Sequence, residues 1–248
     1  MKRKIILITG ASSGLGAGLA REFAAKGCHL ILCARRLDRL TSLRQELVER
    51  FGARVELAEL DVTDHMSVFA VFRNVAGALG SIDRIIVNAG IGEGRSIGTG
   101  HFELNRRTLE TNMIAALAQC EAAVEIFRAQ GYGHLVLMSS MSAARGMPRH
   151  LTAYAASKAG LAHLAEGIRS ELLRTQIRVT TLFPGYIRTE LNEGAKRLPF
   201  EMDVISGCRA LARAIDKEPA TACVPAWPWR PIWSLLRHLP LSWVTALQ

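Results

Sequence analysis

Tyr154 and Lys158 stand four residues apart in the sequence, and this spacing brings two side chains together on one face of a helix. A cation held beside a tyrosine stabilises the phenolate and lowers the pKa of the phenol, so the tyrosine can donate or accept a proton. Ser139 and Ser140, upstream of the pair, could add a hydroxyl group to the same site. A lone tyrosine–lysine pair is usually exposed and inert. Together with the serines and the turn described next, it predicts proton-transfer chemistry.

A glycine-rich run, Thr9–Gly16, follows an apolar segment and precedes a helical one. Glycines let the backbone turn sharply and approach a pyrophosphate closely, and the helix N-terminus supplies amide donors to the phosphates. The alternative is an ordinary glycine-rich loop. Its position between the first predicted strand and the first predicted helix favours nucleotide binding.

The elements that must position these residues alternate along the chain. Short runs rich in Ile, Val and Leu predict strands, and longer segments between them predict helices. The strands are expected at residues 5–9, 29–34, 55–59, 82–87, 135–139 and 179–183, and the helices at 14–26, 39–51, 67–78, about 104–130 and around Tyr154. Strands that are apolar at nearly every position are typical of a parallel sheet covered on both faces. The pattern predicts an α/β fold with a Rossmann-type doubly wound parallel sheet.

Composition predicts one globular domain. The 248 residues are 49% hydrophobic and 21% charged, and the net charge of +9 is spread along the chain without a basic stripe, so we expect no nucleic-acid partner. Five cysteines form no Cys-x-x-Cys pair, which predicts no metal site, no disulfide framework and a cytoplasmic location. The first apolar run is too short for a secretion signal. No apolar stretch reaches the roughly 18 residues of a membrane span.

The order of these motifs, Thr-Gly-x-x-x-Gly-x-Gly followed by Tyr-x-x-x-Lys, resembles the short-chain dehydrogenase/reductase family from residue 4 to about residue 191. The resemblance implies a catalytic set of Ser140, Tyr154, Lys158 and Asn112. Tyr154 would donate its proton to a substrate carbonyl oxygen as hydride arrives from the nicotinamide, and Ser140 would stabilise the charge on that oxygen. Lys158 would lower the pKa of Tyr154 and bind the nicotinamide ribose. Asn112 would hold a water that links Lys158 to solvent.

The serine differs from the family pattern in its spacing. The family usually has the serine 13 residues before the tyrosine, whereas Ser140 precedes Tyr154 by 14. We expect the additional residue to lie in a loop at 149–153, because a loop absorbs an insertion without moving the strand end. Ser139 and Ser142 remain alternatives to Ser140.

The resemblance also implies a cofactor-binding set. It includes the glycine turn, the adenine contact after the third strand, the motif after the fourth strand, the Tyr–Lys pair and the segment expected to contact the nicotinamide. These residues are Gly10, Ser12, Ser13, Gly14, Leu15, Gly16, Arg35, Asp61, Val62, Asn88, Ala89, Gly90, Tyr154, Lys158, Pro184, Gly185, Ile187 and Thr189.

The end of the second strand predicts which nicotinamide cofactor binds. An NAD site has an acid near this position for the ribose 2′-hydroxyl, whereas an NADP site has an arginine for the 2′-phosphate. Here the strand ends in Arg35 and Arg36, and the first acid is Asp38. Arg35 would pair with the phosphate, so we expect NADP(H) to be preferred and NAD(H) to remain possible. The alternative is that both arginines are simply exposed.

Residues 227–248 are predicted to form a helical tail that is distinct from the catalytic domain at residues 1–226. All four tryptophans lie in this tail, Ile232, Leu235, Leu236 and Leu239 follow a helical stripe, and no acid is present. Tryptophans beside a basic amphipathic helix suit a membrane interface. Packing over the substrate cleft or against a partner subunit is the alternative.

The sequence therefore predicts an NADP(H)-dependent oxidoreductase that interconverts a ketone and a secondary alcohol, with an apolar or lipid-like substrate. Three rivals remain: an NAD-dependent alcohol dehydrogenase, a non-catalytic dinucleotide-binding sensor, and a peripheral membrane protein whose tail is the main functional element. The family resemblance also implies a homodimer or homotetramer built through the long helices at 104–130 and 152–175.

Overall fold

The structure is a computed structural model of the chain, and it describes residues 3–192, 194 and 198–246. Residues 1–2 and 247–248, which the predicted domain and tail include, lie outside the described residues. Across the described part of the chain, seven parallel strands form one sheet in the order β3-β2-β1-β4-β5-β6-β7. The strands are β1 (Ile5–Thr9), β2 (His29–Ala34), β3 (Val55–Glu59), β4 (Arg84–Val87), β5 (Tyr132–Met138), β6 (Gln176–Pro184) and β7 (Thr221–Val224). The chain starts in mid-sheet and winds outward in both directions, which confirms the predicted doubly wound fold.

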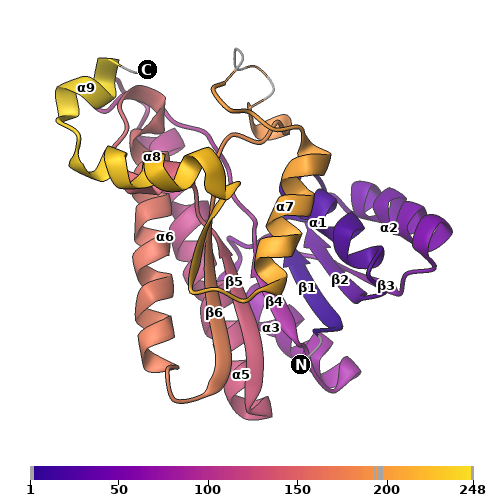
Figure 1. The fold of residues 1–248 in the computed structure, drawn as a ribbon. Helices are drawn as coiled ribbons and strands as arrows, with labels where there is room; N and C mark the ends of the chain where they lie inside the picture. Colours follow the sequence, from indigo (N-terminus) through magenta and orange to yellow (C-terminus); the bar gives the residue numbers. More distant parts are fainter. Residues whose placement is uncertain (1–2, 193, 195–197, 247–248) are drawn as a thin grey trace.

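Helices cover both faces of the sheet (Figure 1). One apolar cluster receives buried side chains from α1 (Gly14–Ala24), α2 (Leu37–Phe51) and α7 (Val204–Asp216). The other receives them from α3 (His65–Leu79), α5 (Ala115–Gln130) and α6 (Thr152–Glu171). The other α-helices among the described residues are α4 (Phe102–Leu109), α8 (Ala226–His238) and α9 (Leu241–Ala246). In the upper part of Figure 1, α8 crosses the end of the sheet beside β6 and α6, and α9 lies beyond it at the upper left.

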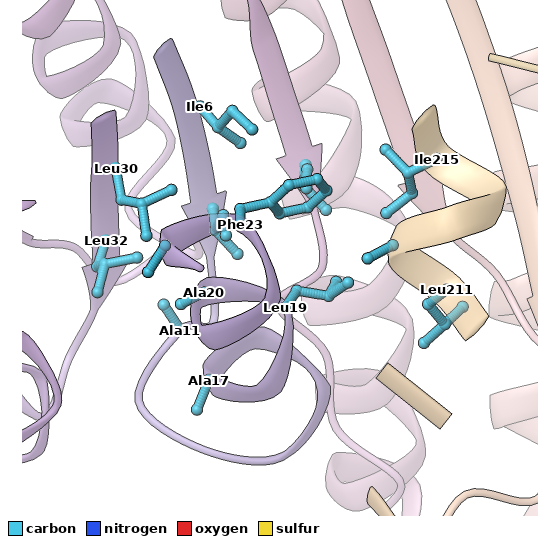
Figure 2. Packing of buried hydrophobic residues seen from close by; sticks show 14 of the residues in the cluster. Ile6, Ala11, Ala17, Leu19, Ala20, Phe23, Leu30, Leu32, Leu211 and Ile215 are labelled. Atoms are coloured by element: carbon cyan, nitrogen blue, oxygen red, sulfur yellow. The ribbon is translucent and has the colours of Figure 1, made fainter. Parts of the chain in front are cut away.

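The core beneath the glycine turn is built around Phe23 of α1. Figure 2 shows Phe23 among Ile6 of β1, Leu30 of β2 and Ile215 of α7, all fully buried. Burying each of these large apolar side chains contributes about 1.5–3 kcal/mol. This packing fixes α1 against the sheet and so fixes the turn that precedes it.

Two parts of the fold differ from the sequence expectation. The expected helix at 104–130 is present as α4 and α5, but a π-helical turn, Glu110–Ile114, separates them. Strand β7 was not expected, because its four residues are too few to show a period; it pairs with β6. Its neighbour α7 is amphipathic and packs beside α1 (Figure 1).

A buried polar network links three strands at the end of the sheet that lies away from the glycine turn. Arg84 donates from Nε to Nδ1 of His134 at 2.8 Å and from Nη1 to Asp216 at 3.0 Å. The Nε2 atom of His134 lies 2.9 Å from the hydroxyl of Thr180. Burial and the adjacent Arg84 lower the pKa of His134 well below its ordinary value. His134 is therefore neutral in the folded protein, and it ties β4 to β5 and β6.

Candidate active site

The glycine turn leaves no room for side chains at two positions. Gly10 has a φ of +64°, and a Cβ there would lie 2.8 Å from the Cα of Ala89. A Cβ on Gly16 would lie 2.3 Å from the carbonyl oxygen of Gly10. The turn thus forms a cradle that only glycine permits, as close approach to a dinucleotide requires. This observation fits the cofactor that the sequence implies.

The segment after β4 braces this turn. Asn88 donates from Nδ2 to the carbonyl oxygen of Thr9 at 2.9 Å, and the hydroxyl of Thr9 accepts from the main-chain N–H groups of Asn88 and Ala89. A Cβ on Gly90 would lie 3.0 Å from Oδ1 of Asn112 and 3.4 Å from Nζ of Lys158. Three of the predicted cofactor-binding residues, Asn88, Ala89 and Gly90, therefore join the glycine turn to the Tyr–Lys pair.

Arg36 lies against the serines of the turn, whereas the sequence had singled out Arg35. The Arg36 guanidinium donates to the hydroxyl oxygens of Ser12 at 3.0 Å and Ser13 at 2.8 Å. Ser13 also precedes the first residue of α1, but its side chain makes no capping hydrogen bond there. A cation and two hydroxyl groups thus converge beside the N-terminus of α1. Arg35 and Arg36 are adjacent in the sequence, and the sequence alone could not show which of the two contacts the serines of the turn.

Arg35 faces outward instead. Its side chain is 70% exposed and lies 3.7 Å from the carboxylate of Asp61. Asp61 in turn accepts hydrogen bonds from the N–H and hydroxyl of Thr63 at 3.0 Å and 2.7 Å, and Val62 is buried. Although burial opposes it, hydrogen bonding to Thr63 together with Arg35 lowers the pKa of Asp61.

Lys158 lies buried one helical turn after Tyr154 on α6. Its ammonium donates to the carbonyl oxygen of Met138 at 2.9 Å and lies 5.8 Å from the centroid of the Tyr154 ring. Burial lowers the pKa of Lys158 to about 8. The structure therefore brings together the predicted pair at the end of β5.

The pKa of Tyr154 departs from the expectation. Burial raises it, and the hydrogen bond to Ser140 is the contact that lowers it. We expected Lys158 to lower this pKa, but its ammonium lies 5.8 Å from the centroid of the tyrosine ring and donates a hydrogen bond to the carbonyl oxygen of Met138. The nearer polar partner of the phenol is thus Ser140.

The structure separates the three candidate serines. Ser139 is buried and donates its hydroxyl proton to the carbonyl oxygen of Lys158 at 2.8 Å. Ser140 has an extended backbone, accepts from the N–H of Ser142 at 3.2 Å and is hydrogen-bonded to Tyr154. The Ser142 hydroxyl is buried and has no hydrogen-bond partner within the described residues. Of the three, Ser140 is the one placed at the phenol.

Asn112 lies in the π-helical turn and is buried. Its Oδ1 accepts from the N–H of Ile91 at 2.8 Å, and its Nδ2 donates to the Ile91 carbonyl oxygen at 2.9 Å and to the Ser157 hydroxyl at 3.2 Å. The side chain is thus committed to positioning the segment after Gly90. Turns of this type often occur at functional sites, and no pattern in the sequence predicted this one.

The segment after β6 folds back toward the glycine turn. Pro184 ends β6, and the N–H of Gly185 donates to the carbonyl oxygen of Val224 at 2.9 Å. Ile187 is buried, and a Cβ on Gly207 of α7 would lie 2.6 Å from its side chain. Thr189 lies opposite Gly14, with 3.5 Å between its Cβ and a Cβ built there.

Glu190 links this segment to two arginines at the start of α2. It accepts a hydrogen bond from Arg39 at 2.7 Å and lies 3.6 Å from Arg36. A carboxylate therefore sits beside the cation that contacts Ser12 and Ser13.

The tail packs onto the same end of the sheet. Trp229 of α8 is 5% exposed and joins Met141 and Phe183 in an apolar cluster, and the Trp233 ring lies 4.2 Å from that of Phe183. A Cβ on Gly185 would lie 2.0 Å from Nε1 of Trp229. The first half of the tail is thus part of the wall around the predicted active site.

The part of the chain that the structure describes contains neither a metal-binding cluster nor a membrane-spanning helix. There is no group of three or more His, Cys, Asp or Glu side chains that could hold a metal ion. Nor does any helix within the described ranges have the length and apolar character needed to cross a membrane.

Known proteins resemble this chain in both sequence and fold. The model of the short chain dehydrogenase family matches residues 4–197. An uncharacterized oxidoreductase of Mycobacterium tuberculosis is 50% identical over 239 residues, which cover 96% of this chain and 94% of that protein. The short-chain dehydrogenase from Sphingobium yanoikuyae in complex with NADPH has a TM-score of 0.81 and 28% identity, covering 96% of this chain and 97% of that one. An NADPH-dependent 3-quinuclidinone reductase from Rhodotorula rubra has a TM-score of 0.76 and 27% identity, covering 88% and 85%.

Proposed function

Because the chain belongs to the short-chain dehydrogenase family, we propose that it is an NADP(H)-dependent oxidoreductase that interconverts a ketone and a secondary alcohol. The observation that carries the proposal is Lys158, buried one helical turn after Tyr154 with its ammonium 5.8 Å from the centroid of the tyrosine ring, together with the action of the Ser140 side chain on the pKa of the phenol. A phenol and a hydroxyl that meet at one point can both donate to a single carbonyl oxygen. The glycine cradle at Gly10 and Gly16 would hold the dinucleotide.

The proposed chemistry divides between cofactor and protein. The nicotinamide, when bound, supplies hydride to the carbonyl carbon. Tyr154 donates its hydroxyl proton to the carbonyl oxygen, which completes the alcohol, and Ser140 donates a hydrogen bond to the same oxygen while negative charge develops there. Lys158, as the resemblance implies, would bind the nicotinamide ribose, and the hydrogen bond from Ser140 is the contact that lowers the pKa of Tyr154. Asn112 positions the segment after Gly90 and, as the resemblance implies, would hold a water leading to Lys158.

The cofactor preference rests on the arginines near the turn. The guanidinium of Arg36, together with Ser12 and Ser13, offers the donor set that a 2′-phosphate requires. The 2′-phosphate would take the place of Glu190 as the partner of Arg36 and Arg39, and Arg35 remains a further candidate. The Sphingobium yanoikuyae enzyme, solved with NADPH, and the NADPH-dependent reductase from Rhodotorula rubra support the same preference.

Initial rates of NADPH oxidation, with NADH in parallel, test this function against ketones of graded chain length. Turnover with NADPH that is faster than with NADH supports the proposal. Equal or faster turnover with NADH favours the alternative, an NAD-dependent alcohol dehydrogenase. NADPH binding without turnover of any ketone favours a dinucleotide sensor.

We propose further that the outer surface of the tail contacts an anionic membrane. Trp227 and Trp243 are 79% and 63% exposed, Arg230 and Arg237 add positive charge, and no acid follows Glu218. Exposed tryptophans beside basic residues suit a lipid headgroup region. Sedimentation with phosphatidylserine vesicles should carry the protein down, and the double variant Trp227→Ala/Trp243→Ala should stay in the supernatant. Equal sedimentation of both proteins would contradict this proposal.

Oligomerisation is proposed through α5 and α6, as the family resemblance implies. Ile114 and Leu117 are exposed apolar side chains on the π turn and α5, and covering them in a dimer would remove them from water. Sedimentation velocity gives the assembly state. A single monomeric species at micromolar concentration would contradict the proposal.

A further inference from the structure

We propose that Tyr186, Phe200 and Trp229 form an aromatic subsite that binds a flat ring of the substrate beside the reacting carbonyl. This inference rests on the function proposed above, because it names the class of ketone that the site accepts. It assigns Tyr186 and Phe200 to contact with the substrate, and Trp229, from the tail, to positioning both rings.

The three rings form one contact group. The Tyr186 ring lies edge-on to Trp229, with centroids 5.3 Å apart and planes at 77°, and the Phe200 ring does the same at 6.1 Å and 88°. Edge-to-face contacts at these separations are favourable. Trp229 therefore packs against both rings, which come from opposite ends of the segment between β6 and α7.

The group is adjacent to the predicted reaction centre. Tyr186 follows Gly185, against which the indole nitrogen of Trp229 packs. Trp229 also belongs to the same apolar cluster as Met141, the residue after Ser140. A ring held by this subsite would thus lie beside the carbonyl that Tyr154 protonates.

The two outer rings present apolar surface that the protein itself does not cover. Tyr186 is 38% exposed and Phe200 is 61% exposed. Phe200 also has a φ of 53°, which places a bulky residue in the left-handed region that it rarely adopts. Strain of this kind persists where the surrounding structure fixes it, and it concentrates at binding sites.

Trp229 itself is held by packing. It is almost fully buried, yet its Nε1 has no hydrogen-bond partner within the described residues. A buried donor without a partner is unfavourable, so the packing against Gly185, Met141 and Phe183 must offset it. We therefore assign Trp229 a positioning role, in which the ring matters and the N–H does not.

Binding measurements separate ring recognition from general hydrophobicity. The probes are acetophenone, cyclohexyl methyl ketone and octan-2-one, which have equal carbon number, titrated calorimetrically into the Tyr154→Phe protein saturated with NADPH. We expect acetophenone to bind about threefold to tenfold more tightly than the other two, the range of an aromatic contact. Equal affinities for the three ketones would overturn the proposal.

Variants test the assignment of each ring. Tyr186→Leu and Phe200→Leu should each reduce the preference for acetophenone and leave NADPH affinity unchanged. Trp229→Leu should abolish the preference and Trp229→Phe should retain it, while Trp227→Leu is the matched control, since Trp227 is exposed on the same helix. Loss of the preference in Trp227→Leu, or its retention in Tyr186→Leu and Phe200→Leu, would overturn the assignment.

The outcome also distinguishes the subsite from the proposed function. If the native chain binds NADPH but reduces no ketone, the function fails. If it reduces ketones but binds the three probes with equal affinity, the proposed function stands and the proposed subsite is wrong. Should Trp229→Leu not fold, Tyr186→Leu decides the question, because its ring lies at the surface.

Discussion

The ammonium of Lys158 donates a hydrogen bond to the main-chain oxygen of Met138 at 2.9 Å. This contact ties the helix of the proposed proton donor to the end of β5, where the serine pair begins. Ser139 reinforces it by donating to the main-chain oxygen of Lys158 at 2.8 Å. Two hydrogen bonds thus join α6 to the end of β5, and the structure offers separate tests of the residues involved.

Ser140→Ala should lower kcat for ketone reduction by about 10²–10³-fold, the loss typical of removing a donor to a developing oxyanion. Ser139→Ala is the matched control. Ser139 is adjacent to Ser140, but its buried hydroxyl donates to the main-chain oxygen of Lys158 and not to the phenol. The substitution should lower thermal stability more than kcat. Steady-state kinetics and melting curves of both variants give the answer, and equal losses of kcat would contradict the assignment.

Arg36→Ala should weaken NADPH binding by about tenfold or more while leaving NADH binding unchanged, since a charge-assisted hydrogen bond contributes about 1.5–3 kcal/mol. Arg35→Ala should have the smaller effect, because Arg35 faces solvent. Glu190→Gln should strengthen NADPH binding by removing a competing carboxylate. Fluorescence titration with both cofactors measures these constants, and a larger loss in Arg35→Ala would contradict the geometry.

Lys158→Met should abolish activity yet raise stability at pH 7 by about 1–3 kcal/mol. Burial lowers the pKa of Lys158 from 10.5 to about 8. The unfolded chain therefore binds the proton more tightly, and below pH 8 the folded state carries the full penalty of the buried charge. Met138 loses its hydrogen-bond donor, which reduces the gain. Urea denaturation measures the difference, and a less stable variant would contradict this account.

His134 should make the protein less stable as pH falls. Its folded pKa lies well below 6.5, so below about pH 6.5 the unfolded chain takes up a proton that the folded chain does not, and stability falls by about 1.4 kcal/mol per pH unit from this group alone. His134→Gln should flatten the dependence of unfolding free energy on pH between 7 and 5. An unchanged slope would show that other groups dominate.

The sequence predicted best where local pattern decides structure. Strands β1, β2 and β3 match their expected ranges; apolar runs mark β1 and β2, whereas β3 contains two glutamates. The Tyr–Lys pair follows from helical spacing alone. Strand β7 and the π turn around Asn112 were missed, because the first is too short for a period and the second arises from packing.

Contacts between distant segments were the least predictable part. The choice between Arg35 and Arg36 depends on how β2 meets the glycine turn. The burial of Trp229 against Gly185 joins residues far apart in the chain, and composition alone left the tail open to a membrane, a partner or the cleft. No spacing in the sequence encodes either relationship.

The most direct test of the central claim is transfer of deuterium from NADPH labelled at its hydride position to a ketone that the native protein reduces. We expect labelled alcohol from the native protein, and none from Tyr154→Phe, which should bind NADPH with native affinity. Labelled alcohol formed at the native rate by Tyr154→Phe would contradict the role of Tyr154 as the proton donor.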